Sequence, residues 1–163
     1  MNAMFRTDQR VVVMRGIPGS GKSTWAKQYL VDRQGFKRVN MDDLRTMLTN
    51  YKFSKANEKL VKHLARLVVV TLVTMGENVC IDNTSITVKH VDDWQELVEG
   101  LNPNIRVETR EFHTSLDECL LRNTFREGVA RIPAHVIVDF HRRWTETLAT
   151  EQRDKYAQCP APS

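Results

Sequence analysis

The segment "GIPGSGKS", from Gly16 to Ser23, constrains the fold more than any other part of this 163-residue chain. It satisfies every fixed position of the pattern G-x-x-x-x-G-K-[ST], and it follows a β-branched run and precedes a helix-forming segment. Glycines in this pattern let successive backbone N–H groups point at one anion, and the following helix adds its positive end. The segment therefore predicts a phosphate-binding loop between a buried strand and a helix.

The chemistry of such a loop assigns roles to its side chains. Lys22 is expected to reach the β- and γ-phosphates of a nucleotide, and the Ser23 hydroxyl is expected to ligate Mg²⁺. The expected nucleotide-binding residues of the loop are Gly16, Pro18, Gly19, Ser20, Gly21, Lys22, Ser23 and Thr24. The Asn-Lys-x-Asp signature of guanine readers does not occur in the sequence, so ATP is expected rather than GTP.

Short apolar strands alternate with helical segments along the rest of the chain. Strands are expected at 11–15, 37–40, 78–82 and 104–113, and helices at 23–33, 41–48, 54–75, 87–101, 115–127 and from Pro133 towards Tyr156. The stretch "LVVVTLV" inside 54–75 is β-branched and also suits a strand. The alternation predicts one α/β domain over 1–163, with a parallel sheet covered by helices. Ligands then bind beyond the carboxyl ends of the strands.

Composition limits the compartment and the partners. No apolar run approaches the ~18 residues of a membrane span, and the first residues lack the apolar core of a signal peptide. A cytoplasmic protein is therefore expected. If a phage encodes it, the cytoplasm is that of the host cell. Cys80, Cys119 and Cys159 are odd in number and far apart, which suits neither a disulfide framework nor a zinc site.

The positive charge favours a polyanionic partner. The net charge is +4, and every basic residue between Lys89 and Lys155 is an arginine, among them Arg106, Arg110, Arg122, Arg126, Arg131, Arg142 and Arg143. The guanidinium fork matches phosphate oxygens. The same residues also suit an ordinary solvated surface, so both interpretations stay open.

The residues that follow the third expected strand help to distinguish ATP hydrolysis from phosphoryl transfer. The strand ends in "CIDNTS", where Asp82 is followed by Asn83 and not by the glutamate that polarises water in AAA-type ATPases. This favours transfer of a phosphoryl group to an organic hydroxyl over hydrolysis. A nucleotide-dependent binding module without chemistry remains the alternative of a different class.

Transfer to a hydroxyl needs a base, and the segment "NMDDLR" after the second expected strand supplies two candidates. Asp42 is expected at the loop–helix junction facing the cleft, while Asp43 is expected to serve the helix dipole; both could instead be capping acids. Arg45 lies one turn after Asp42 on the same helix face, where it could hold an acidic group of the acceptor.

The segment "LLRNTFREG" suggests a lid over the nucleotide. If 115–127 is helical, Arg122 and Arg126 lie four residues apart on one face and can close over the triphosphate. The alternative is a solvated face on which Glu118 pairs with Arg122.

Taken together, "GIPGSGKSTWA", "NMDDLR" and "RNTFR" resemble the phage-type polynucleotide 5′-kinases, a family of P-loop phosphotransferases, over roughly Val11 to Glu127. The segment "IDNTS" is a looser match, because Ser85 stands where the family more often has Asn. The resemblance implies a P-loop kinase fold with a four-stranded parallel sheet and an arginine-bearing lid helix. Only the kinase domain of the family is expected in a chain of this length.

The resemblance also implies roles for single residues. Lys22, Asp42 and Arg126 would be catalytic, with Asp42 as general base and Arg126 on the transferring phosphate. Arg122 would lie beside the nucleotide, and Ser23 and Asp82 would bind Mg²⁺. The acceptor site would comprise Asp42, Arg45, Asp82 and Thr84.

The implied acceptor is a hydroxyl of DNA or RNA, most simply the 5′-OH. Two alternatives remain: a phage kinase acting on the hydroxymethyl group of a modified base in DNA, and a zeta-toxin-like or small-molecule kinase.

Overall fold

The computed structural model describes residues 8–158, with side chains as far as Asp154. Its sheet has four parallel strands, as expected, and the strand order is β2-β3-β1-β4. The strands are β1 (Arg10–Arg15), β2 (Lys37–Val39), β3 (Val79–Ile81) and β4 (Arg106–Glu111). β1 lies in the middle, where Val13 is in register with Ile81 of β3 and Thr109 of β4.

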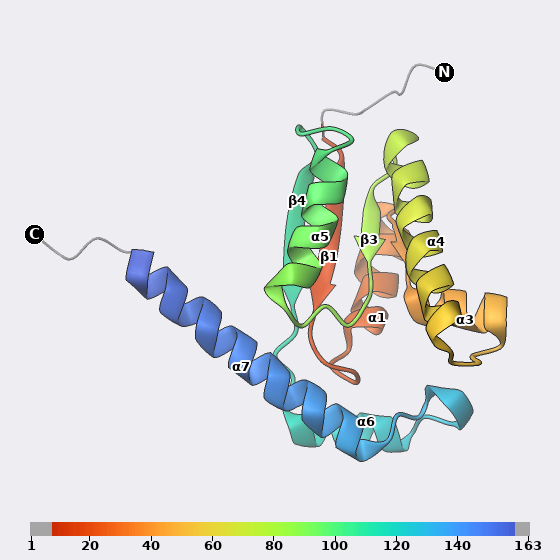
Figure 1. The fold of residues 1–163 in the computed structure, drawn as a ribbon, viewed down its shortest axis with the longest axis vertical. Helices are drawn as coiled ribbons and strands as arrows, with labels where there is room; N and C mark the ends of the chain where they lie inside the picture. Colours follow the sequence, from red (N-terminus) through yellow and green to blue (C-terminus); the bar gives the residue numbers. More distant parts are fainter. Residues whose placement is uncertain (1–7, 159–163) are drawn as a thin grey trace, which may run out of the picture.

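Helices cover both faces of the sheet (Figure 1). One face carries α4 (Lys55–Thr74) and α5 (Val88–Glu99); the other carries α1 (Lys22–Trp25), the π-helix η1 (Ala26–Val31) and α2 (Asp32–Gln34). Because side chains alternate along a strand, Val11 and Val13 of β1 join the first layer, and Val12 and Met14 join the second. Each such burial stabilises the fold by about 1.5–3 kcal/mol.

A third layer lies beyond the carboxyl ends of the strands. It contains α6 (Leu116–Thr124), the 3-10 helix η2 (Gly128–Ala130) and α7 (Ala134–Gln158), seen below the arrowhead of β1 in Figure 1. Ile17 of the phosphate-loop segment packs there against Cys119 of α6 and Trp144 of α7. The buried Arg15 at the end of β1 pairs with Glu111 and Glu151. These contacts fix α7 against the central strand.

The predicted helices are present, with two differences: the expected helix 23–33 is mostly the π-helix η1 between the short helices α1 and α2, and the expected helix 115–127 ends early. The segment 54–75 is one helix, α4, and its β-branched stretch is not a strand, because Val69 and Val73 lie on the helix face that packs on the sheet. Ser54 caps α4 by accepting from the backbone N–H of Asn57. The helix α3 (Met41–Thr49) and the glycine stop at Gly35, whose φ is 69°, also follow the prediction.

The expected helix over 115–127 is wrong at its carboxyl end. α6 ends at Thr124, because the buried amide of Asn123 bonds both backbone groups of Ile132, at 2.7 Å and 3.0 Å. These bonds turn the chain away from the helix axis. Arg126 therefore lies outside α6, and Arg122 and Arg126 do not share one helix face.

Two further expectations concern thiols and membranes. Cys80 and Cys119 are buried free thiols, and burial raises the pKa of Cys80 to about 12; Cys159 lies outside the described residues. None of the helices within residues 8–158 combines the length and the apolar character that a membrane span requires.

Candidate active site

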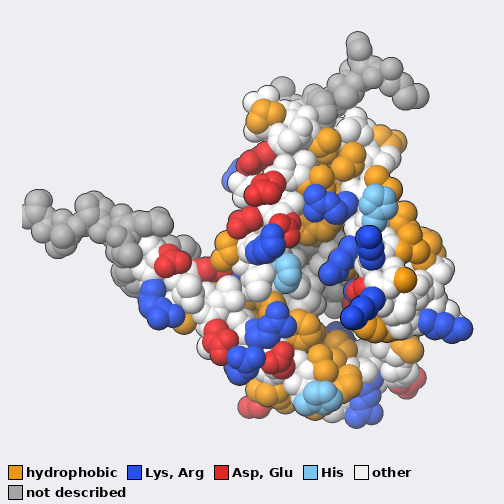
Figure 2. Space-filling view, viewed as in Figure 1, with side chains coloured by type: hydrophobic (Ala, Val, Ile, Leu, Met, Phe, Trp, Pro, Cys, Tyr) orange, Lys and Arg blue, Asp and Glu red, His pale blue; other side chains and the backbone are white. Residues whose placement is uncertain are grey.

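A cavity of about 640 Å³ opens beyond the carboxyl ends of the strands, where the phosphate loop, α3, α4, α5 and α7 meet. Figure 2 shows the molecule hollowed at this place, with Lys and Arg side chains gathered along the α4 side. The predicted site residues that line the cavity are Pro18, Gly19, Gly21, Lys22, Ser23, Thr24, Asp42, Arg45, Asp82, Thr84 and Arg126. Gly16, Ser20 and Arg122 support the loop from outside this lining.

Two glycines of the loop are required by conformation and by space. Gly16 and Gly19 have φ values of 141° and 86°, which L-residues rarely adopt. A Cβ on Gly16 would lie 2.9 Å from the carbonyl oxygen of Phe112, and one on Gly19 would lie 2.8 Å from that of Cys119. The loop is therefore packed closely against α6 and against the residue that follows β4, and larger residues at these positions would displace the loop.

Lys22 lies folded back into the loop. Its ammonium donates to the carbonyl oxygens of Gly16 and Ile17, both at 2.7 Å, and to the Ser20 hydroxyl at 3.3 Å. The side chain is 7% exposed. Burial lowers the pKa of Lys22 to about 8, although the Asp82 carboxylate acts in the opposite direction. A phosphate in the loop would supply the negative charge that this buried cation lacks.

Asp82 is held from one side only. Its Oδ2 accepts from the Arg38 Nε at 2.7 Å and from the Asn40 amide at 3.3 Å. Its Oδ1 is buried and has no hydrogen-bond partner within the described part of the chain. A carboxylate oxygen that faces no donor, in a cavity also lined by Ser23, suits a magnesium ion with its water shell.

The metal would rest on few protein groups. Within residues 8–158 there is no cluster of three His, Cys, Asp or Glu side chains that could hold a metal. Mg²⁺ keeps several waters and is bound through one or two protein oxygens together with substrate phosphates. Ser23 and Asp82 therefore fit the ion only in company with a bound nucleotide.

The structure separates the two adjacent acids at the start of α3. Asn40 caps this helix through its Oδ1, which accepts from the backbone N–H groups of Asp42 and Asp43 at 2.9 Å and 3.0 Å. Asp42 lines the cavity, whereas Asp43 lies outside its lining and pairs with Arg38 on the surface. Asp42 is the acid that can meet a bound molecule.

Two donors orient the Asp42 carboxylate. Its Oδ1 accepts from the Arg45 guanidinium and from the Tyr51 hydroxyl, the latter at 3.2 Å. Tyr51 reaches it through a turn in which Asn50 and Tyr51 both have positive φ, 45° and 61°. Such backbone is costly for residues other than glycine and is found where the surrounding structure requires it. Asn50 is a weak sequence signal for this turn, because Asn adopts positive φ more readily than most residues, and Tyr51 gives no such signal.

Arg45 is itself fixed by Glu58 of α4. The guanidinium forms a bidentate pair with Glu58, at 2.6 Å and 2.8 Å, and this pairing lowers the pKa of Glu58. Three of the five guanidinium N–H groups are used by Glu58 and Asp42, so two remain for a ligand. Glu58 is 13 positions from Arg45 in the sequence, so the motif "NMDDLR" alone does not indicate this pairing.

The two lid arginines occupy different positions. Arg122 donates to the carbonyl oxygen of Gly19 at 3.2 Å and pairs with Glu118, so it braces the phosphate loop from α6. Arg126 lines the cavity from the segment after α6. The cavity also takes in basic residues that no motif marked, Lys62 and Arg66 of α4 and Arg143 of α7.

The fold and this loop together define a P-loop phosphate-binding domain. Residues 11–148 match a family model described as "AAA domain" (AAA_33), and the chain belongs to that family. The match covers the whole cavity lining and all four strands except Arg10, the first residue of β1.

Curated relatives carry the names of polynucleotide kinases. The chain is 32% identical, over 72% of its length, to the bifunctional polynucleotide phosphatase/kinase of Schizosaccharomyces pombe. It is 28% identical, also over 72% of its length, to a protein of Autographa californica nuclear polyhedrosis virus named as a candidate bifunctional polynucleotide kinase/RNA ligase. The chain spans 24% and 18% of these two proteins. The resemblance that the motifs indicated is confirmed.

A solved structure has the same fold. The chain superposes on one in the Pnkp1/Rnl/Hen1 RNA repair complex with a TM-score of 0.77, at 22% identity, over 92% of this chain and 48% of the other. The expected P-loop kinase fold is confirmed by this likeness.

Proposed function

We propose that this chain is an ATP-dependent kinase that transfers the γ-phosphoryl group to a hydroxyl of a nucleic acid, the 5′-OH of DNA or RNA. The observation that carries the proposal is the single cavity in which the phosphate loop and the Asp42 carboxylate meet. Asn83 follows Asp82 where an ATPase would have a water-polarising glutamate, which supports transfer over hydrolysis. The polynucleotide-kinase names of the relatives support the acceptor class.

In this mechanism each side chain acts on a stated atom. The loop N–H groups and Lys22 hold the β- and γ-phosphates, and Arg126 meets the charge that develops on the transferring group. Asp42 takes the proton from the acceptor hydroxyl while the hydroxyl oxygen bonds to the γ-phosphorus. The bond between the γ-phosphorus and the oxygen that bridges it to the β-phosphate breaks, and ADP is released. Ser23 and Asp82 would hold Mg²⁺, which supplies positive charge to the phosphate oxygens when bound.

The acceptor is expected on the α3 side of the cavity. Asp42, Arg45, Asp82 and Thr84 line this side, and the two unused N–H groups of Arg45 suit a phosphate next to the reacting hydroxyl. A small sugar or nucleoside acceptor needs no such clamp. We also propose a cytoplasmic location, in a host cell if a phage encodes the protein, on the sequence features given above.

Transfer of label from γ-³²P-ATP tests the proposal. The acceptors are a 5′-hydroxyl oligonucleotide, the same oligonucleotide with a 5′-phosphate, one with an internal hydroxymethylated base, and free nucleosides and sugars. Label on the 5′-hydroxyl strand alone supports the proposal. Label that survives a 5′-phosphate block but requires the modified base identifies a modified-base kinase. Efficient transfer to free sugars, or no transfer to any acceptor, contradicts the proposal, and the last result defines a binding module.

A further inference from the structure

A row of basic side chains runs along α4, outside the motifs that define the site. The row consists of Lys55, Lys59, Lys62 and Arg66, and we call it the α4 stripe. Its spacing of four, three and four residues returns each member to the same side of a helix with 3.6 residues per turn. At a rise of 1.5 Å per residue, the stripe is about 16 Å long.

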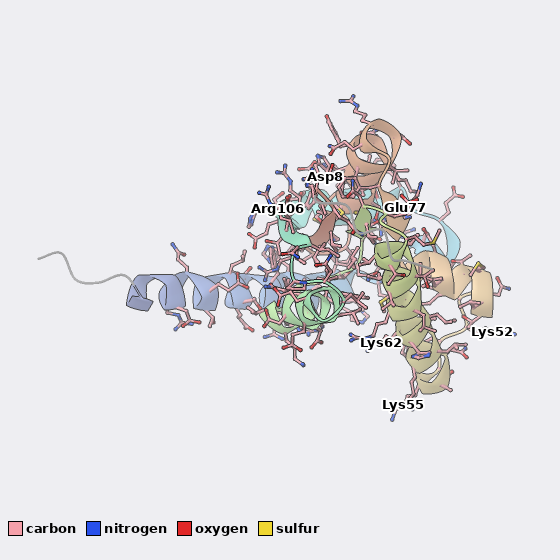
Figure 3. The ribbon with its side chains drawn as sticks, turned by 90° about the horizontal axis from the view of Figure 1, so that it is seen from above. Asp8, Lys52, Lys55, Lys62, Glu77 and Arg106 are labelled. Atoms are coloured by element: carbon pink, nitrogen blue, oxygen red, sulfur yellow. The ribbon has the colours of Figure 1, made fainter. Side chains whose placement is uncertain are left out.

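The members of the stripe are exposed cations that form no close ion pair within the described residues, although Lys62 interacts through space with Glu58 and Arg66 with Asp93. Within residues 8–158, none of the four forms an ion pair, although nearby cations such as Arg45 and Lys89 are paired. Figure 3 shows Lys55 and Lys62 projecting from α4 on the side turned toward α5, with Lys52 projecting away from it. The side chain of Arg66 lies over the ring of Trp94, 5.9 Å from its centroid.

The stripe is continuous with the cavity. Lys62 and Arg66 line the cavity that holds Asp42, while Lys55 and Lys59 extend the row beyond its lining. Arg143 of α7 lines the same cavity. Acidic side chains gather on α5 instead, among them Asp92, Asp93 and Glu96 (Figure 2). Of these acids only Asp93 lines the cavity, where it pairs with Lys89, so α4 is the more positive of these two sides of the cavity mouth.

We infer that the α4 stripe is the path along which the acceptor strand leaves the active site. The inference rests on the proposed function and adds to it a surface and a polarity: the backbone phosphates that follow the reacting nucleotide lie on α4 and away from the acids of α5. At about 3.4 Å per phosphate of a stacked strand, the stripe accommodates about five nucleotides. A chain of phosphates matches a row of unpaired cations, whereas a single metabolite does not need one.

A direct binding experiment tests the stripe without catalysis. Binding of a fluorescein-labelled single-stranded 12-mer is followed by anisotropy across a salt series, for the full chain and for Lys55→Gln/Lys59→Gln. Each lost phosphate contact lowers the slope of log K against log salt by about 0.7, so the double variant loses about 1.4. At low salt, the affinity should fall roughly tenfold. The matched control is Lys27→Gln/Lys52→Gln, which removes two exposed lysines that lie outside the stripe and the cavity lining.

A kinetic experiment connects the stripe to the acceptor. For the 12-mer, the double variant should raise KM roughly tenfold with unchanged kcat. For a dinucleotide with a 5′-hydroxyl, which is too short to reach Lys55 and Lys59, KM and kcat should both stay at the level of the unmodified chain. If the double variant changed KM equally for the 12-mer and the dinucleotide, or for neither of them, the inference would be overturned.

The two experiments keep the inference and the proposed function apart. Transfer to both acceptors with KM independent of length overturns the stripe and leaves the kinase proposal standing. No transfer to any acceptor contradicts the kinase proposal, and the anisotropy data then still decide whether the stripe holds a strand. Binding of a polyglutamate peptide as tightly as the 12-mer would assign the stripe to an acidic protein and overturn its assignment to nucleic acid.

Discussion

The two halves of the cavity are built in different ways. The phosphate half comes from one continuous segment, in which Lys22 bonds carbonyl groups only five and six residues away. The acceptor half comes from side chains of α3, α4 and the loop after β3, and its contacts join residues far apart in sequence, such as Arg38 to Asp82. The phosphate half therefore depends on local backbone geometry, and the acceptor half depends on the packing of the whole domain.

Of the two adjacent acids of α3, replacement of Asp42 should give the largest effect on activity, because it removes the general base of the acceptor half. Asp42→Asn should lower kcat by about 10²–10⁴-fold, the usual effect of losing a general base, while ATP still binds. Asp43→Asn is the matched control, since Asp43 lies outside the cavity lining and should keep near-normal turnover. The measurement is label transfer beside nucleotide binding by calorimetry. An inactive Asp43 variant beside an active Asp42 variant would reverse our assignment.

Lys22→Ala removes the only lysine of the phosphate half and tests its role in transfer. It removes a charge that acts most strongly as the γ-phosphoryl group leaves, so kcat/KM should fall on the order of 10²-fold. The expected loss is the same for long and short acceptors, because the change lies on the donor side. Lys27→Ala, an exposed lysine on the following helical segment, is the control. Near-normal turnover of the Lys22 variant would exclude the loop from the mechanism.

The two arginines that were expected on one helix should respond differently. Arg126→Lys keeps the charge in the cavity but loses the planar fork, and kcat should fall roughly tenfold. Arg122→Lys should instead raise KM for ATP at unchanged kcat, since Arg122 braces Gly19 from outside the cavity. Steady-state kinetics with varied ATP separate the two results. Full activity of the Arg126 variant would leave only a nonspecific charge effect.

The pH dependence of nucleotide binding isolates the buried ammonium of the loop. The pKa of Lys22 is lowered to about 8, and a bound triphosphate raises it, so the affinity for ATP should fall about tenfold from pH 7 to pH 9. At pH 8.5, binding should take up roughly 0.8 proton, measured by calorimetry in buffers of different ionisation enthalpy. Lys22→Arg stays charged throughout this range and should show no such uptake. Uptake that persists in this variant would point to another group.

Tyr51→Phe should give the smallest effect and the one most specific to the acceptor half. It removes one of the two donors to Asp42 and leaves Arg45 in place, so kcat should fall about two- to fivefold at unchanged KM for ATP. Tyr29→Phe, at an exposed tyrosine of η1, is the control. A rise in KM for ATP in the Tyr51 variant would show that the hydroxyl serves the donor half instead.

Much of the fold follows from local sequence, and the differences have tertiary causes. The strands β1 and β3 coincide with short apolar runs that contain β-branched residues, and Ser54, Thr87 and Ser115 cap the helices α4, α5 and α6. The end of α6 could not be predicted, because Asn123 bonds Ile132 across nine positions. The last turns of α4 are helical despite their β-branched residues, because a helix there presents Val69 and Val73 to the sheet.

The candidate site divides in the same way. The loop residues and Asp42 follow from spacing and from the resemblance, and the structure brings Asp42 and all of the predicted loop residues except Gly16 and Ser20 into the lining of one cavity. The partners that orient the acceptor side, Arg38, Tyr51 and Glu58, belong to no motif and are recognised only through their contacts with Asp82, Asp42 and Arg45. Which roles these side chains have stays a prediction until the variants are measured.

The buried Arg15 sets a lower limit on the length of the cooperative unit. Its guanidinium lies 4.9 Å from the centroid of the Trp144 ring and is bonded to Glu151, whereas the segment that matches the family ends at residue 148. A chain shortened to that homology boundary would keep every loop and strand residue and still lose one of the two carboxylates that neutralise this charge. Removing the partner of a buried ion destabilises a protein strongly. The boundary of similarity and the boundary of cooperative folding therefore differ, and the second extends at least to Glu151.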